Sequence, residues 1–359
     1  MPGHLTLGIP ASFLLYGANG YVGEAAARLA VEQGLKPILA GRDASKIEPL
    51  ARGLGLEFRA CALDDPQGLD RALRGVPLVL HLAGPYKFTA RPMVDACLRA
   101  GAHYLDITGE IPVFEAIAAR DAEARARKVM LLPAVGFDVV PTDCLAAHLK
   151  RRLPSATRLA LAFQSVGRSG LPPGTQRTMI ELLPFGDRVR QGGKLVVPEA
   201  GVKTRTLDFG QGPVQGMRFT WGDVFTAFYT TGIPDIEVYT VLPAAMRKQI
   251  ALLKKLRPLL RFAPLRALLR RGVKPGPTAE ARARTVTHVW GEVSDAQGRV
   301  AVSRLHGPEA GLVWTTRAAL AVVRKALDGN VAPGFQTPAR VYGADLVLEC
   351  EGVTREDVA

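Results

Sequence analysis

The chain has 359 residues, of which 48% are apolar and 22% charged, so it has the composition of an ordinary soluble globular protein and is long enough for two domains. It contains no run of eighteen apolar residues, and its first twelve residues lack a charged stretch followed by a long apolar one, so neither a membrane-spanning helix nor a signal peptide is predicted. The four cysteines stand far apart without a C-x-x-C pair, which predicts buried free thiols, no metal site and a cytoplasmic location.

The first predicted elements are a strand, a glycine turn and a helix. Apolar residues at 13–16 are followed by glycines at 17, 20 and 23, and a helix is predicted from about residue 21 to residue 33. Such glycines let a phosphate approach the first amides of the helix, whose positive dipole end attracts anions. The alternative is a plain strand-to-helix turn, which glycines also form. The context favours a dinucleotide site made by Gly17, Ala18, Asn19, Gly20, Tyr21, Val22 and Gly23.

The end of the second predicted strand, residues 36–40, indicates which dinucleotide is bound. In NAD sites this position carries an acid for the ribose 2′-hydroxyl, whereas an arginine nearby accommodates the 2′-phosphate of NADP. Here Gly41 stands where the acid is expected, and Arg42 follows with a planar, permanently charged group. The alternative is a solvated arginine beside Asp43. The missing acid predicts NADP(H) as the cofactor.

Strands and helices continue to alternate to about residue 150. Further strands are predicted at 57–62, 77–82, 103–106 and 129–132, and one charged surface helix is predicted over 111–127. This alternation predicts an α/β fold with a Rossmann-type parallel sheet in residues 1–150. Sites in such sheets lie beyond the carboxyl ends of the strands, where Tyr86, Asp106, Glu110 and Asp138 stand. Asp64 is expected either to contact the adenine end of the cofactor or to cap the next helix.

The pattern changes after a helix predicted at about 142–152. Strands with stronger alternation are predicted at 159–165, 203–209, 216–221, 236–241, 284–293 and 300–306. Loops rich in glycine and proline, such as 169–174, join them, and a helix is predicted over 312–327. We therefore predict a second, α+β domain with a mixed or antiparallel sheet over 151–330, followed by a C-terminal segment, 331–359. Five aromatic residues are expected to line an apolar tunnel or to lie in the core: Phe219, Trp221, Phe225, Phe228 and Tyr229.

The net charge of +13 is concentrated in one segment. Residues 244–274 hold ten Lys or Arg and no acid, and removing these ten from the 46 basic residues leaves 36 against 33 acidic ones. Basic amphipathic helices are predicted at 244–271, broken by Pro258 and Pro264. They are expected to form a solvated layer, or else to make peripheral contact with an anionic membrane or an acyl carrier. Nucleic acid is not expected, because Phe262 is the segment's one aromatic residue.

Six motifs in chain order resemble those of the saccharopine dehydrogenase-like oxidoreductases. They are GANGYVG (17–23), AGR (40–42), LAGPY (82–86), YLDITGE (104–110), PAVGFDVVPTD (133–143) and GFQTPA (334–339). Val139 and Thr142 depart from the family pattern, which has serines there. The resemblance implies NADP(H) binding, with Ala83, Gly84 and Pro85 among the cofactor contacts, and a C-terminal segment that returns to the first domain. Among relatives, the chain looks most like the trans-acting enoyl reductases and uncharacterised saccharopine dehydrogenase-like proteins.

A Rossmann domain with a second domain over the nicotinamide is the general plan of a hydride-transfer enzyme, which must also supply a proton. No tyrosine has a lysine four residues on, so the usual short-chain reductase pair is absent, and neither G-x-S-x-G nor H-E-x-x-H occurs. The first candidate donor is Tyr86, whose loop is expected beside the nicotinamide; packing against the ring is its alternative. Asp138 is the second candidate, with a turn carboxylate as its alternative. Asp143 is expected to cap the next helix.

These observations predict an NADPH-dependent reductase of a hydrophobic small-molecule or carrier-bound substrate, with an enoyl C=C of a lipid or polyketide intermediate as the reducible group. A C=N reductase like the enzyme that names the family is the second prediction. The third, from another class, is a membrane-surface adaptor that binds NADP(H) without turnover. The sequence is compatible with an oligomer and does not identify the substrate.

Overall fold

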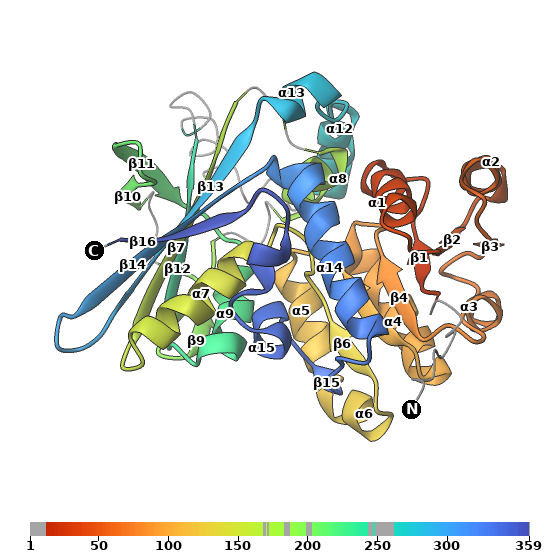
Figure 1. Cartoon of the computed structure of the whole chain (residues 1–359), viewed down its shortest axis with the longest axis horizontal. Coiled ribbons are helices and arrows are strands. Elements are labelled where there is room, and N and C mark those ends of the chain that lie inside the picture. Colours follow the sequence, from red (N-terminus) through yellow and green to blue (C-terminus); the bar gives the residue numbers. More distant parts are fainter. Residues whose placement is uncertain are drawn as a thin grey trace, which may run out of the picture.

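The computed structural model describes residues 12–167, 170, 172–182, 187–198, 203–242, 247 and 262–358. Within them the chain forms two sheets, which lie side by side with helices around and between them (Figure 1). Sheet A has the strand order β15-β6-β5-β4-β1-β2-β3 and is parallel throughout. Sheet B is mixed, because β7 and β12 run parallel while its other pairs are antiparallel. The predicted fold class is confirmed.

Sheet A is built almost entirely from the first part of the chain. Its strands are β1 (Leu14–Tyr16), β2 (Ile38–Gly41), β3 (Phe58–Ala60), β4 (Leu78–His81), β5 (His103–Asp106), β6 (Met130–Leu132) and β15 (Gly334–Phe335). The helices that accompany them are α1 (Tyr21–Glu32), α2 (Ala44–Leu54), α3 (Pro66–Ala72), α4 (Tyr86–Ala100), α5 (Ile111–Ala118), α6 (Asp121–Ala126) and α7 (Val140–Arg152). The central strands are apolar and buried because helices cover both faces of a parallel sheet.

Sheet B takes most of the second part of the chain. Its strands are β7 (Arg158–Val166), β8 (Val189–Gln191), β9 (Lys194–Val196), β10 (Thr204–Asp208), β11 (Pro213–Arg218), β12 (Asp235–Val241), β13 (Val286–Ser294), β14 (Val300–Gly307) and β16 (Thr354–Val358). The helices of this part are α8 (Pro173–Leu182), α9 (Asp223–Thr231), α12 (Ala263–Arg271), α13 (Ala279–Ala283), α14 (Thr315–Leu327) and α15 (Pro338–Tyr342). Helix α14 contacts α1 and β4, so it covers sheet A although it follows strand β14 of sheet B in the chain.

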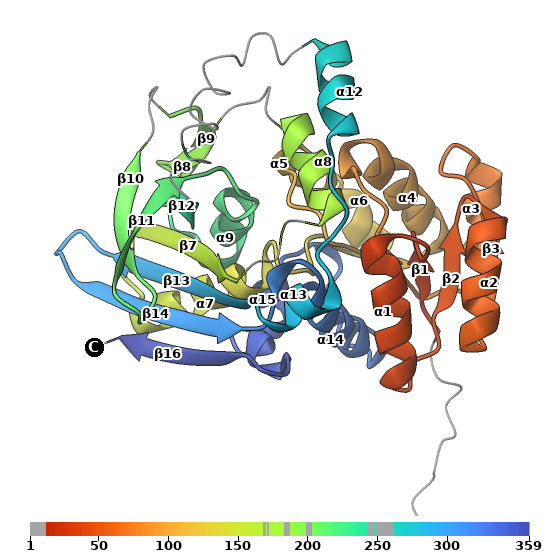
Figure 2. The same ribbon diagram turned by 90° about the horizontal axis from the view of Figure 1, so that it is seen from above.

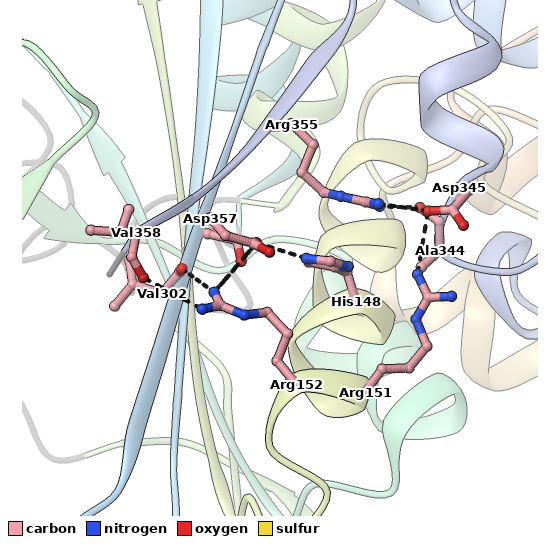
Figure 3. A network of polar contacts seen from close by, with 10 residues as sticks. His148, Arg151, Arg152, Val302, Ala344, Asp345, Arg355, Asp357 and Val358 are labelled. Atoms are coloured by element: carbon pink, nitrogen blue, oxygen red, sulfur yellow. Dashed lines mark hydrogen bonds and ion pairs between the residues drawn. The ribbon is translucent and has the colours of Figure 1, made fainter.

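The segment after residue 331 divides between the two sheets. Strand β15 pairs with β6 of sheet A, whereas β16 pairs with β14 at the edge of sheet B. Ion pairs fasten β16 to α7 (Figure 3): His148 Nε2 lies 2.7 Å and Arg152 Nη1 3.3 Å from the carboxylate of Asp357. Beside them Arg355 lies 2.7 Å from Asp345. The C-terminal segment therefore ties α7, which lies between the sheets, to sheet B.

Three expectations about elements are wrong. The helix predicted over 111–127 is two helices, because the chain turns at Arg120, which forms ion pairs with Asp95 and Glu123. Helix α5 is also not a surface helix, since its apolar face packs against α4 and α9. The loop predicted at 169–174 overlaps the start of α8.

The prediction that Asp143 caps α7 is wrong. Asp143 lies buried in the first turn of this helix. It accepts hydrogen bonds from the Thr230 hydroxyl at 2.5 Å and from the Ala339 N–H at 2.8 Å, which belong to α9 and α15. These partners are distant in the chain, so no local pattern indicates them. The residue in the cap position is Val139.

Most of the predicted basic helices at 244–271 lie outside the described residues. The described part, α12, contacts α8. No helix among the described residues has the length and apolar character needed to cross a membrane. The described residues also contain no cluster of three or more His, Cys, Asp or Glu side chains placed to hold a metal ion.

Candidate functional site

The turn between β1 and α1 is shaped to bring a ligand close to the backbone. Gly17 has φ +87°, which a residue with a Cβ rarely adopts, and the amides of Gly17 and Ala18 both donate to the Ala40 carbonyl, at 2.8 and 3.2 Å. A Cβ on Gly23 would lie 2.1 Å from the Gly17 carbonyl oxygen, so α1 can pack this tightly only with glycine there. No side chain caps α1, which leaves the amides of its first turn for an anion.

The end of β2, where the ribose is expected, carries a glycine and an arginine and no acid. A Cβ on Gly41 would lie 2.9 Å from Ile47 Cδ1 and 3.5 Å from Asn19 Oδ1, so the acid that NAD sites carry would require the end of the Ile47 side chain to shift. Asp43 caps α2, where its carboxylate accepts from the Ser45 N–H and hydroxyl at 3.2 and 2.6 Å. Arg42 is exposed and forms no ion pair with any described carboxylate. This arrangement fits the 2′-phosphate of NADP.

Asp64 lies exposed after β3, at the same edge of the sheet. The alternative prediction, that Asp64 caps the next helix, is wrong. Its neighbour Asp65 caps α3, where its carboxylate accepts a hydrogen bond from the Gly68 N–H at 2.9 Å. A contact between Asp64 and the adenine end of the cofactor stays a prediction.

The loop after β4 lies against the glycine turn and is fixed by a buried acid. A Cβ on Gly17 would come within 3.0 Å of Ala83, so the two loops are in contact. The Glu110 carboxylate accepts the N–H groups of Tyr86 and Lys87, at 2.8 and 3.0 Å, and thereby caps α4. Burial raises the pKa of Glu110, against the effect of these donors. The loop of Ala83, Gly84 and Pro85 therefore lies beside the glycine turn, and its contact with the cofactor stays a prediction.

Tyr86 points into the protein. Its hydroxyl donates to the His81 carbonyl at 3.1 Å, and the side chain is buried. Burial raises the pKa of Tyr86 well above its usual value. These contacts weigh against the prediction that Tyr86 supplies a proton, and they favour the alternative of a packing residue.

Asp106 braces the ends of β5 and β6. Its carboxylate accepts from the Tyr104 hydroxyl at 2.7 Å and from the N–H groups of Thr108 and Ala134 at 2.9 and 2.8 Å. Burial raises the pKa of this carboxyl to about 6. Both carboxylate oxygens of Asp106 accept hydrogen bonds from the protein. Asp106 therefore shapes the site without being available to a ligand.

Asp138 differs from the other acids of the site. Its side chain is half-buried, and within the described residues its carboxylate accepts no hydrogen bond. A Cβ on Gly109 would lie 3.0 Å from Asp138 Oδ2, so a larger residue at position 109 would press on the carboxyl. Burial and, after it, the charge of Glu110 raise the pKa of Asp138 to about 7. Asp138 is thus a carboxyl group that can carry a proton near neutral pH.

Aromatic side chains from three elements gather beside Asp138. The Trp221 indole N–H donates to the Asp138 carbonyl at 2.8 Å. The Trp221 ring lies 5.1 Å from Phe163 and 5.7 Å from Phe219, and Phe163 lies 6.0 Å from Phe137. We call these four residues, Phe137, Phe163, Phe219 and Trp221, the aromatic wall. The sequence did not identify Phe163 and Phe137 as site residues. They belong to a strand and a loop that are separate in the chain, and no sequence spacing indicates that they come together.

The remaining predicted aromatic residues lie on α9, where Phe225 is buried, Phe228 is half-buried and Tyr229 is exposed. Phe225 stacks on Phe114 with ring centres 5.7 Å apart, and Tyr229 lies 5.0 Å from Phe225. Phe228 packs against the guanidinium of Arg190 at 4.1 Å. Of the five aromatic residues that were candidates for a tunnel or the core, two therefore belong to the aromatic wall, and of the other three Phe225 lies in the core.

Polar side chains of helix α8 contact the start of α4 and Glu110. The sequence did not predict these contacts. Glu181 is buried and forms an ion pair with Lys87, and it lies 3.1 Å from Arg270 of α12. The Thr178 hydroxyl donates to Glu110 at 3.3 Å. Lys87 and Glu181 are 94 residues apart, so their pairing has no local signal.

Comparison with known proteins agrees with this geometry. Residues 13–132 match the family model of the saccharopine dehydrogenase NADP binding domain. The chain is 29% identical over 203 residues to the saccharopine dehydrogenase-like oxidoreductase of Mus musculus, which covers 50% of this chain and 47% of that protein. It is 32% identical over 148 residues to the trans-acting enoyl reductase of Mycobacterium leprae, covering 39% and 35%.

Among solved structures, the chain has the fold of apo saccharopine dehydrogenase (L-Glu forming) from Saccharomyces cerevisiae. The TM-score is 0.66 at 13% identity, covering 97% of this chain and 100% of that one. The sequence alignments span about half the length of the curated relatives or less. The family resemblance predicted from the motifs is confirmed, and the NADP-binding family model agrees with the predicted cofactor.

Proposed function

From the premise that residues 13–132 are a saccharopine dehydrogenase NADP-binding domain, we propose that the chain is an NADPH-dependent reductase of a hydrophobic substrate. The reducible group is an enoyl C=C of a lipid or polyketide intermediate. The observation that supports this most is Asp138, an unpartnered, protonatable carboxyl beside the aromatic wall. The likeness to trans-acting enoyl reductases supports the same substrate class.

The roles of the chain's residues follow from their positions. NADPH, when bound, supplies a hydride from its nicotinamide ring. The glycine turn binds the pyrophosphate at the first amides of α1, and Arg42 binds the 2′-phosphate. Asp138 holds the proton that the second carbon of the double bond requires. The aromatic wall holds the apolar substrate and keeps water from the reacting carbons.

The first experiment is a titration with NADPH and with NADH, followed by nicotinamide fluorescence, on the wild type and Arg42→Ala. We expect NADPH to bind more tightly than NADH, and Arg42→Ala to weaken NADPH binding about tenfold or more, because a charge-assisted contact is lost. NADH binding should stay unchanged. Arg52→Ala, an exposed cation paired with Glu48 on α2, is the matched control. Failure of the wild type to bind either nucleotide would refute the reductase proposal.

A substrate screen then separates the proposed activity from its alternatives. Enoyl thioesters, free or on an acyl carrier, test C=C reduction, and keto-acid plus amino-acid pairs test C=N reduction. Turnover of the second set alone would replace the proposal by an imine reductase. NADPH binding without turnover of either set would favour the adaptor.

We also propose that the basic segment 244–271 brings the protein to an anionic membrane surface from a cytoplasmic location. Its described helix α12 carries an exposed Leu268, 59% accessible, and Phe262 at its start is 66% accessible. Exposed apolar side chains among cations are suited to an anionic lipid surface. Co-sedimentation with vesicles of anionic and of neutral lipid tests this, and binding to an acyl carrier protein instead would identify the other predicted partner.

A further inference from the structure

A short connection from the second half of the chain crosses the dinucleotide site. Residues 272–278, which we call the strap, join α12 to α13 and pass between α8 and α1 (Figure 2). The side-chain amide of Gln176 bonds both backbone groups of Lys274, at 3.2 Å to the carbonyl and 3.0 Å from the N–H. The strap is therefore fixed along α8 before it reaches α1.

The strap reaches the first residue of α1. The Tyr21 hydroxyl donates to the Pro277 carbonyl at 3.2 Å. A Cβ on Gly276 would lie 2.6 Å from the Tyr21 ring, so the strap backbone rests directly on that ring. Because Tyr21 is the first residue of α1, the strap lies at the end of the helix where the phosphate is proposed to bind.

These contacts hold Arg282 of α13 at the same place. Its Nη1 donates to the Tyr21 hydroxyl at 2.9 Å and to the Pro277 carbonyl, and its guanidinium lies 5.9 Å from the Tyr21 ring centre. The Nε and Nη2 atoms donate to no described residue, and Arg282 forms no ion pair with a described carboxylate. A half-buried cation is thus held by two neutral oxygens.

The acid that lies near Tyr21 does not neutralise this cation. Glu309 is buried, and its carboxylate accepts the N–H groups of Gly311, Leu312 and Val313 at 2.8, 2.8 and 3.1 Å. Arg282 and the positive end of the α1 dipole therefore lie together, and no described carboxylate forms an ion pair with Arg282. Two positive features placed together are unfavourable unless an anion binds between them.

We propose that Arg282 is a cofactor-binding residue that the second half of the chain contributes to the pyrophosphate of the dinucleotide. The inference rests on the proposed function, because it requires that a dinucleotide binds the glycine turn. The pyrophosphate is common to NADPH and NADH, so Arg282 acts on both cofactors alike, whereas Arg42 distinguishes them. Since Arg282 closes over the bound cofactor with the strap, it slows dissociation more than it speeds association.

The test is fluorescence titration and stopped-flow dissociation of NADPH and NADH from Arg282→Gln. We expect both affinities to fall about tenfold, as for loss of one charge-assisted hydrogen bond, with the NADPH-to-NADH ratio unchanged and the dissociation rate raised. Tyr21→Phe, which removes the hydroxyl that positions Arg282, is expected to produce a smaller loss of the same kind. Arg284→Gln removes the same charge two residues away, at an exposed position, and is expected to have no effect.

Unchanged cofactor affinity in Arg282→Gln would refute this inference and leave the proposed function standing. A loss of affinity restricted to NADPH would place Arg282 at the 2′-phosphate. An equal loss of affinity in Arg284→Gln would mean that Arg282 acts only through the net charge of the protein. Either result would also refute the inference. If Arg282→Gln does not fold, as judged by thermal unfolding without nucleotide, Arg282→Lys and Tyr21→Phe decide the question. A wild type that binds no nucleotide would refute the proposed function together with this inference.

Discussion

At the scale of single residues, the acids of the site differ in what surrounds them. Asp106 and Glu110 accept several backbone N–H groups each, so their carboxylates hold loops in place. Asp138 Oδ2 lies close to Gly109, and its carboxylate accepts no hydrogen bond from a described residue. A carboxyl in an apolar, half-buried position keeps its proton to higher pH, as a general acid must.

We predict that Asp138→Asn lowers kcat about a hundredfold or more and leaves the Kd for NADPH unchanged, because loss of a general acid affects the chemical step. In the wild type, kcat should fall as the pH rises past about 7, where Asp138 loses its proton, and this dependence should be absent from the variant. Tyr86→Phe is the control and is expected to keep turnover, since the Tyr86 hydroxyl is buried and donates to the His81 carbonyl. The reverse pattern, with Tyr86→Phe inactive and Asp138→Asn active, would identify Tyr86 as the proton donor and contradict this role for Asp138.

Asp138 should also affect stability in a pH-dependent way. Its pKa is about 7 in the folded protein and 3.8 when unfolded, so the folded state binds the proton more tightly. The wild type therefore loses stability relative to Asp138→Asn as the pH rises from about 4 to 7, by up to about 4 kcal/mol at 1.36 kcal/mol per pH unit. Urea unfolding of both proteins across this range measures the difference. Parallel stability curves would mean that the carboxyl is not shifted.

At the scale of elements, the close packing of α1 on β1 is the feature that makes the phosphate site. Gly23 faces the Gly17 carbonyl, and the distance leaves no room for a methyl group. Backbone oxygens cannot move aside as a flexible side chain does. The glycine spacing of the sequence is thus explained by a contact between the helix and the turn that precedes it.

We predict that Gly23→Ala displaces α1 and weakens NADPH binding more than tenfold, because the amides of the first helical turn leave their positions. Gly53→Ala is the matched control: Gly53 lies in α2, and a Cβ there meets nothing within 4 Å. The control should bind NADPH normally and be more stable by about 0.5–1 kcal/mol, as expected for alanine in a helix. Normal binding by Gly23→Ala in fluorescence titration would contradict this account.

At the scale of the whole molecule, the two sheets are joined by elements distant in sequence. Helix α14 and strand β15 return to sheet A, and β16 returns to sheet B, where α7 holds it by ion pairs (Figure 3). The strap brings a third connection to α1. The proposed closure over the cofactor depends on these connections, because the strap from the second half of the chain lies on α1 of the first half.

We predict that Asp357→Asn, which removes the acid shared by His148 and Arg152, lowers the free energy of unfolding by about 1 kcal/mol and leaves NADPH binding unchanged. Glu351→Gln breaks a single exposed pair with Arg317 and should cost less. Urea unfolding with and without NADPH checks both variants. A loss of NADPH affinity in Asp357→Asn would show that the β16 edge is coupled to the cofactor site.

The sequence by itself determined the features that depend on local backbone and on periodicity. Glycines at 17, 20 and 23, the absence of an acid at Gly41 and the alternation of apolar runs predict the turn, the cofactor and the fold class, because each is governed by neighbouring residues. Two of the predicted site residues, Tyr86 and Asp138, lay at the correct edge of the sheet for the same reason.

Only the tertiary structure decided which way the side chains at that edge point and what they meet. The Tyr86 hydroxyl is turned inward to the His81 carbonyl, while the backbone carbonyl of Asp138 accepts a hydrogen bond from Trp221 of the aromatic wall, which is built from separate strands and loops. Arg282 meets Tyr21 across 261 positions of sequence. Such contacts arise when distant elements pack together, and the position of a residue along the chain carries no information about its partners across that distance.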